Sequence, residues 1–136
     1  MTIGGIRTAI QTALATITGL HAYAEYPDII QLPAGIVSLR FTEPVSFDLT
    51  AGNGSVAYHF IIDLLLLRGG SIAEAQDKLD PYLALSGTQS IKVAVEAATL
   101  TTHADVIRVI NVISFGPIDY NGTLYLGARF SVDVWV

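Results

Sequence analysis

The side chains in this sequence that could carry out acid/base or metal chemistry are three histidines and twelve aspartates or glutamates, and the chain has no cysteine. His59 and Asp63 come nearest to a catalytic pair. They lie in a long apolar segment that we predict to be a strand, in which four residues span roughly 13 Å, so the two side chains cannot hydrogen-bond directly. We therefore interpret both as polar residues at an interface.

The other motifs that could carry chemistry are incomplete. His21 and His103 stand in predicted loops without partners at ligand spacing, and lone histidines do not form a metal site. The segment Gly69-Gly70-Ser71 follows a strand and opens a helix, but it lacks the lysine of a phosphate-binding loop and the spaced glycines of a dinucleotide site. The sequence also contains no Gly-x-Ser-x-Gly motif. We expect no enzyme, no metal and no cofactor.

The composition of the chain predicts a subunit of an assembly. The 136 residues are the length of one domain, 1–136. Charged residues make up only 14% of the sequence, against about 25% in typical soluble domains, while hydrophobic residues reach 51%. A domain of this size cannot bury all of that apolar surface in its own core, so we expect other subunits to cover the excess.

The charge argues against tight binding of nucleic acid. The net charge is −5, and the seven basic residues are scattered along the chain, so the protein offers few groups to neutralise phosphates. An acidic surface would instead let a nucleic acid pass without sticking.

The sequence predicts no membrane segment. The densest apolar run, from Phe60 to Leu67, is interrupted by Asp63 and is far shorter than the roughly 20 residues that a spanning helix needs. The N-terminal residues lack the basic region and uninterrupted apolar core of a secretory signal. We therefore expect the chain to remain in the cytoplasm until it assembles.

The pattern of apolar residues predicts an α+β fold, an antiparallel sheet of about five strands with two or three helices packed on it, in the order α-β-β-β-α-(α)-β-β. Ser71 and Glu74 form a capping box, so the second helix should begin at Ile72, and Pro81 should end or kink it. The last strand alternates clearly, with Arg129, Asp133 and Trp135 on its polar face. The predicted helices cover 2–18, 72–80 and 90–98, and the predicted strands cover 35–41, 45–50, 55–68, 105–115 and 123–136.

In order along the chain, these elements resemble the tail-terminator and related head-tail joining proteins of long-tailed bacteriophages. The resemblance covers nearly the whole sequence. It rests on the following segments: Ile17-Thr18-Gly19-Leu20, Tyr26-Pro27-Asp28, Leu32-Pro33-Ala34-Gly35-Ile36-Val37, Phe47-Asp48-Leu49, Ala75-Gln76-Asp77-Lys78-Leu79-Asp80-Pro81-Tyr82-Leu83, Ser90-Ile91-Lys92-Val93-Ala94-Val95-Glu96 and Tyr125-Leu126-Gly127-Ala128-Arg129-Phe130.

The resemblance implies a homohexameric ring in the tail or neck of a virion, which caps the tail tube and stops its polymerisation. Such a ring contacts the tail-tube protein and a neck or head-completion protein, and genomic DNA passes through its lumen without specific binding. The loop from Thr42 to Ser55 is polar and is the expected arm toward a partner, with Glu43, Asp48 and Asn53 as contact residues. We expect the subunit contacts to involve Arg40, Asp63, Arg68, Arg129, Asp133 and Trp135.

Two other functions remain open from the sequence. Another neck component or a tail-tube subunit would share this composition, but a tube subunit should stack indefinitely where a terminator stops at one ring. A small-molecule binding or hydrolytic domain is the more remote alternative. It would need a site at which carboxylates or histidines converge.

Overall fold

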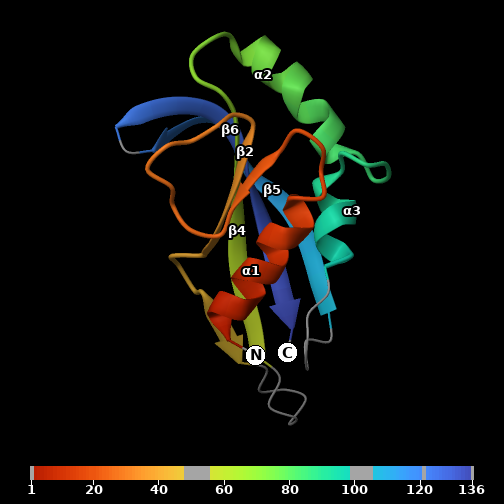
Figure 1. The fold of residues 1–136 in the computed structure, drawn as a ribbon. Coiled ribbons are helices and arrows are strands. Elements are labelled where there is room, and N and C mark those ends of the chain that lie inside the picture. The colour runs from red at the N-terminus through yellow and green to blue at the C-terminus, as the bar shows by residue number, and fades with distance from the viewer. Residues whose placement is uncertain (1, 48–55, 99–105, 121, 136) are drawn as a thin grey trace.

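The computed structural model describes residues 2–47, 56–98, 106–120 and 122–135, and these form an α+β fold with a six-stranded sheet and three α-helices (Figure 1). The fold class predicted from the sequence is confirmed. In chain order the elements are α1 (Ile3–Leu14), β1 (His21–Tyr23), β2 (Ala34–Leu39), β3 (Val45–Phe47), β4 (Val56–Leu67), α2 (Ile72–Leu79), the 3-10 helix η1 (Asp80–Leu83), α3 (Ile91–Glu96), β5 (Val106–Tyr120) and β6 (Thr123–Trp135).

The strands are ordered β1-β2-β4-β6-β5, and β3 pairs with β4 beyond the end of β2. Every pairing is antiparallel except that of β1 with β2, which makes the sheet mixed. The sequence predicted about five strands, and the strand that it missed is β1. This strand is only three residues long and pairs with β2, which begins eleven residues further on, so its sequence is typical of a loop.

Helix α1 is shorter than the predicted range 2–18. The Thr2 hydroxyl caps it by accepting from the amide of Gly5, as expected for a helix start. Its last turn tightens, since the amides of Thr16 and Ile17 donate to carbonyls three residues back rather than four. The chain therefore leaves the helix after Leu14, while Ile17 still reaches the core.

Helix α2 begins as predicted. Ser71 accepts from the amide of Glu74 at 3.1 Å, and the helix starts at Ile72. Pro81 ends the α-helix as expected, because the chain continues as the 3-10 helix η1, which buries Tyr82.

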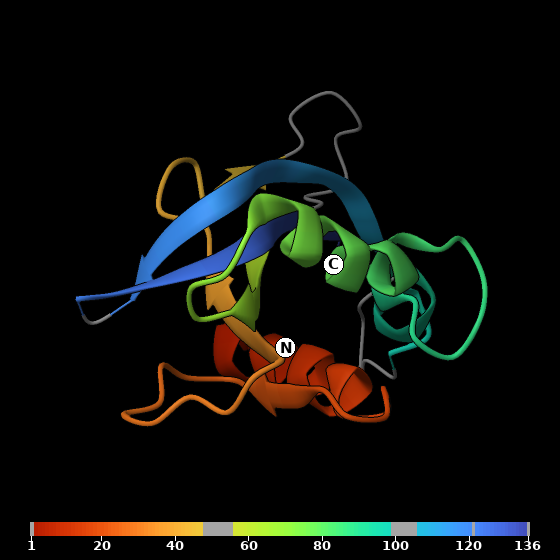
Figure 2. The same ribbon diagram turned by 90° about the horizontal axis from the view of Figure 1, so that it is seen from above.

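One face of the sheet and the helices form the main core. Phe60, Ile62 and Leu64 of β4 are fully buried against Ile6 and Ile10 of α1. Neighbouring side chains of β6 and α3 complete this cluster. The sheet is strongly curved, with β5 bending over toward α3 (Figure 2).

Strand β5 is longer than predicted. The sequence assigned 116–120 to a connection, but these residues pair in register with β6 up to Tyr120 opposite Thr123. The two strands form a long hairpin that projects beyond the body of the domain (Figures 1 and 2).

Candidate functional site

Four polar residues of β4 and β6 lie on the sheet face opposite the helices, which we call the open face. The antiparallel register of β4 and β6 sets His59 directly beside Asp133, and Asp63 directly beside Arg129. Side chains that are directly opposite in such a register share one face and contact each other. The open face therefore carries two polar pairs, each joining strands that are far apart in sequence.

The first pair extends to a serine. His59 Nδ1 lies 2.6 Å from Asp133 Oδ1, and His59 Nε2 lies 2.8 Å from Ser46 Oγ on β3. An ionised carboxylate only accepts hydrogen bonds, so Nδ1 carries a proton toward Asp133, and in the tautomer protonated at Nδ1 alone Nε2 accepts from the Ser46 hydroxyl. The histidine and aspartate side chains are 13% and 18% exposed, so the ring has little freedom to turn away. We call these three residues the Ser46–His59–Asp133 relay.

The second pair is an ion pair within the sheet. Arg129 donates through Nε to Asp63 Oδ1 at 2.7 Å and through its terminal nitrogen to Oδ2 at 3.3 Å. The Asp63 side chain is only 8% exposed. The hydrogen bonds to Asp63 raise the pKa of Arg129, and this outweighs the opposing effect of burial. Both residues were expected at a subunit contact, and in the monomer they neutralise each other.

The part of the open face nearest the hairpin is covered by the chain itself. Ala34, Ile36, Leu65 and Tyr125 form a small second core there. The segment 24–33 lies over it and is fixed to the hairpin, since the Tyr120 hydroxyl donates to the carbonyl of Pro27 at 2.7 Å. The rings of Tyr120 and Tyr26 also stack, with centroids 5.4 Å apart.

The remaining predicted contact residues are dispersed. Arg40 bends back on its own segment, donating to the carbonyls of Thr42 and Glu43 at 2.6 and 2.9 Å. Arg68 is exposed just after the end of β4, while Trp135 is half-buried near the end of β6. Glu43 is exposed, and its carboxylate lies 3.8 Å from the Arg40 guanidinium. Asp48 and Asn53 lie outside the described residues.

Strand β5 forms one edge of the sheet, and this edge is apolar. Ile110 and Ile113 are 49% and 50% exposed, and Val106 and Val112 are each 37% exposed. Within the described residues β5 pairs only with β6, and its pairing is irregular at Ile110 and Ile113. The amide of Val109 donates to Glu96 of α3, so the other backbone groups along the outer side of β5 are the ones available to another strand. This edge was not singled out from the sequence, because the alternation of β5 does not reveal which strand lies outermost.

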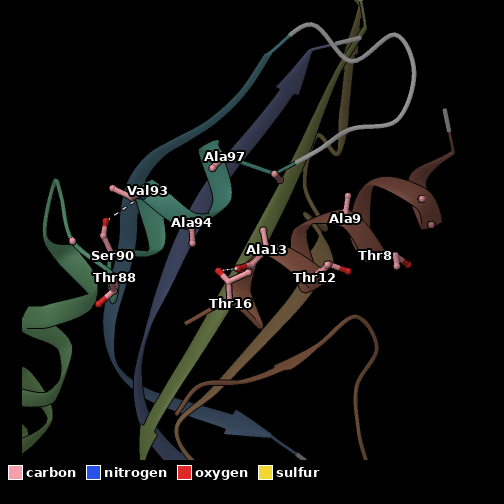
Figure 3. A pocket seen from close by; sticks show the side chains of 14 residues that line it. Thr8, Ala9, Thr12, Ala13, Thr16, Thr88, Ser90, Val93, Ala94 and Ala97 are labelled. Carbon is pink, nitrogen blue, oxygen red and sulfur yellow. Dashed lines mark hydrogen bonds between the residues drawn. The ribbon is translucent and has the colours of Figure 1, made fainter. Parts of the chain in front are cut away.

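A groove also runs between α1 and α3, with a volume of about 880 Å³ (Figure 3). Its walls are small side chains such as Ala9, Ala13 and Ala94, and the polar groups facing it are hydroxyls of Thr and Ser. Among the described residues that line it, none is charged. One of these hydroxyls is already engaged, since Thr16 donates to the carbonyl of Ala13 at 2.6 Å.

Sequence reasoning missed the relay because it compared His59 only with Asp63 on the same strand. The partner of His59 is Asp133, 74 residues later. The available signal was the alternation of the last strand, which placed Asp133 on its polar face. That signal identifies a partner only once β4 and β6 are known to be neighbours.

No protein-family model matches the chain, and no curated protein matches its sequence significantly. Within residues 2–47, 56–98, 106–120 and 122–135, no three acidic or histidine side chains converge as metal ligands would. The helices that the structure describes are all too short or too polar to cross a membrane.

Proposed function

We propose that this protein is a ring-forming structural subunit of a long-tailed bacteriophage tail, with the role of a tail terminator. The observation that carries the proposal is the exposed apolar edge of β5. A long, apolar, unpaired edge strand is an aggregation hazard in a free monomer and is normally covered. The low charge content of the sequence and its resemblance to tail terminators point the same way.

The two edges of the sheet differ, which favours a ring. One edge is the fifteen-residue strand β5, whereas the other consists of the short strands β1 and β3. At this second edge, Phe47 at the end of β3 is 69% exposed, and Phe41 shortly before β3 is 81% exposed. Contact between unlike edges is head-to-tail, and such contacts close into rings when the rotation between subunits allows it.

The proposed ring surrounds the DNA passage of the tail and joins the tube to a neck or head-completion protein. A net charge of −5 per subunit lowers the affinity of such a ring for phosphates, so DNA moves through without adhering. The exposed turn at Glu43 belongs to the arm that we assign to a partner in the tail or neck.

Light scattering of the purified protein, with negative-stain images of the same fractions, tests this proposal. Discrete hexameric rings are the expected result. Long tubes would instead assign the chain to the tail-tube subunit, and a stable monomer that also fails to bind tail tubes would refute the assembly role.

A further inference from the structure

We propose that the Ser46–His59–Asp133 relay is a nucleophilic site that hydrolyses carboxylic esters. This activity goes beyond the structural role and does not depend on it. Its three side chains come from β3, β4 and β6, and two hydrogen bonds of 2.8 and 2.6 Å join them in the order serine, imidazole, carboxylate. That order, with Nε2 toward the hydroxyl and Nδ1 toward the carboxylate, is the connectivity that activates a serine for acyl transfer.

Each member is placed for its role. Ser46 is exposed on a strand at the sheet edge, so a substrate can reach its hydroxyl. His59 is held from both sides, and the carboxylate of Asp133 fixes the tautomer that leaves Nε2 free to take a proton. Asp133 is thus a positioning residue, while Ser46 and His59 would touch the reacting atoms.

The reaction follows from this geometry. The Ser46 oxygen forms a bond to the carbonyl carbon of the ester while its proton passes to His59 Nε2. The protonated ring gives that proton to the departing alcohol as the carbon–oxygen bond of the ester breaks, leaving an acyl group on Ser46. Water then attacks this acyl group, gives a proton to His59 and releases a carboxylic acid, and the same proton returns to Ser46.

The neighbours of Ser46 define the class of substrate. Ala57 is its cross-strand partner, and Trp135 is the partner of Ala57 on the next strand, so all three lie in one row on the open face. Adjacent strands are about 4.8 Å apart, which puts the backbone of Trp135 roughly 10 Å from that of Ser46, with the buried Ala57 between them. The apolar residues of this row favour an uncharged acyl group, whereas an acidic acyl group would approach the carboxylate of Asp133. We therefore assign uncharged short-chain esters.

The test combines a fluorophosphonate probe, which labels activated serines, with hydrolysis of p-nitrophenyl butyrate. Both are measured on wild-type protein and on the Ile110→Lys/Ile113→Lys variant, so that coverage of β3 by another subunit cannot hide the site. We expect a phosphonyl adduct on the peptide that contains Ser46. We expect Ser46→Ala and His59→Ala to lower the hydrolysis rate at least tenfold, since a general base contributes about 10²-fold or more.

Matched variants separate this activity from background reactions. His21→Ala removes an exposed histidine outside the relay, and Ser114→Ala removes an exposed serine of β5, so both should keep the full rate and the adduct. Asp133→Asn should lower kcat with little change in KM. It disturbs the tautomer of His59 but leaves in place the row of Ser46, Ala57 and Trp135 that meets the acyl group. The proposal would be overturned if the probe labelled Ser46 neither in the wild type nor in the Ile110→Lys/Ile113→Lys variant. It would also be overturned if folded Ser46→Ala hydrolysed the ester as fast as the wild type. Neither result would affect the ring assignment.

Discussion

Arg129 Nε lies 2.7 Å from Asp63 Oδ1, and the two residues are direct cross-strand partners in β6 and β4. The carboxylate is nearly buried, while the guanidinium side chain remains 37% exposed. A buried carboxyl group at this depth needs a partner, and the arginine beside it supplies both charge and hydrogen bonds. The pair therefore links the two central strands at a position where the sequence alone shows an isolated charge in an apolar run.

Removing Asp63 should destabilise the fold. Asp63→Ala leaves a partly buried guanidinium without its partner, and since Arg129 retains access to water we expect a loss of about 1–3 kcal/mol in the free energy of unfolding. Urea denaturation measures this loss. Asp77→Ala removes an exposed carboxylate of α2 and should change stability by less than about 0.5 kcal/mol. The double variant Asp63→Leu/Arg129→Met should recover most of the loss, and equal loss in the single and double variants would contradict an energetic role for the pair.

Gly127 should not tolerate a side chain. A Cβ at this position would lie 2.1 Å from the carbonyl oxygen of Leu64. That atom belongs to the backbone of β4 next to a register shift, so it cannot move without disturbing the sheet. We expect Gly127→Ala to lower the free energy of unfolding by about 3 kcal/mol.

Gly4→Ala is the matched control for that substitution. No atom lies within 4 Å of a Cβ at Gly4, which is in α1. Alanine favours a helix over glycine, so this variant should be neutral or more stable by about 0.5 kcal/mol. Thermal unfolding gives the melting temperatures of Gly127→Ala and Gly4→Ala, and we expect that of Gly127→Ala to be clearly lower. Similar melting temperatures would show that the backbones of β4 and β6 leave room for a side chain at Gly127.

The sequence predicted local features well and long-range ones poorly. The Ser71 cap and the helix end at Pro81 depend on neighbouring residues, and both were predicted correctly. The predicted alternation of β6 holds in the body of the sheet but not near the hairpin, where Leu124 is exposed and Tyr125 is buried. The extension of β5 through Gly116 and Pro117 was missed, because these residues break isolated strands and are retained here by pairing with β6. The relay was missed for the same reason, since it exists only in the register between β4 and β6.

Glu96 should give the protein a measurable acid sensitivity. Burial raises the pKa of Glu96. Hydrogen bonds from Lys92 at 2.5 Å and from the amide of Val109 at 3.1 Å lower it. The hydrogen bonds outweigh burial, so the pKa of Glu96 lies below its ordinary value of 4.5. A carboxyl whose folded pKa is depressed stabilises the fold above its unfolded pKa, and that contribution is lost as the pH falls through the folded value.

Glu96→Gln should therefore be less stable than wild type at pH 7, by about 1 kcal/mol, and the difference should shrink as the pH falls below about 4.5. Urea denaturation between pH 7 and pH 3 measures this convergence. Glu25→Gln is the control, since the Glu25 side chain is 84% exposed and lies 3.8 Å from Arg7. A difference for Glu96→Gln that stays constant with pH would show that its charge is not the source of the stabilisation.

The head-to-tail ring makes a prediction that can be tested by mixing. Ile110→Lys/Ile113→Lys should disable the β5 edge, and Phe41→Lys/Phe47→Lys should disable the opposite edge, because buried lysines oppose an apolar contact. Each variant alone should be monomeric by light scattering. An equimolar mixture should form a dimer and nothing larger, since one chain retains an intact β5 edge and the other retains its complement.

Leu124→Lys is the control for this mixing experiment. Leu124 is 59% exposed near the tip of the hairpin, away from the centre of the β5 edge, and the variant should assemble like the wild type. If the Phe41/Phe47 variant assembled normally while the Ile110/Ile113 variant did not, the contact would join two β5 edges. That result would rule out a head-to-tail ring, because a contact between identical edges closes at two subunits.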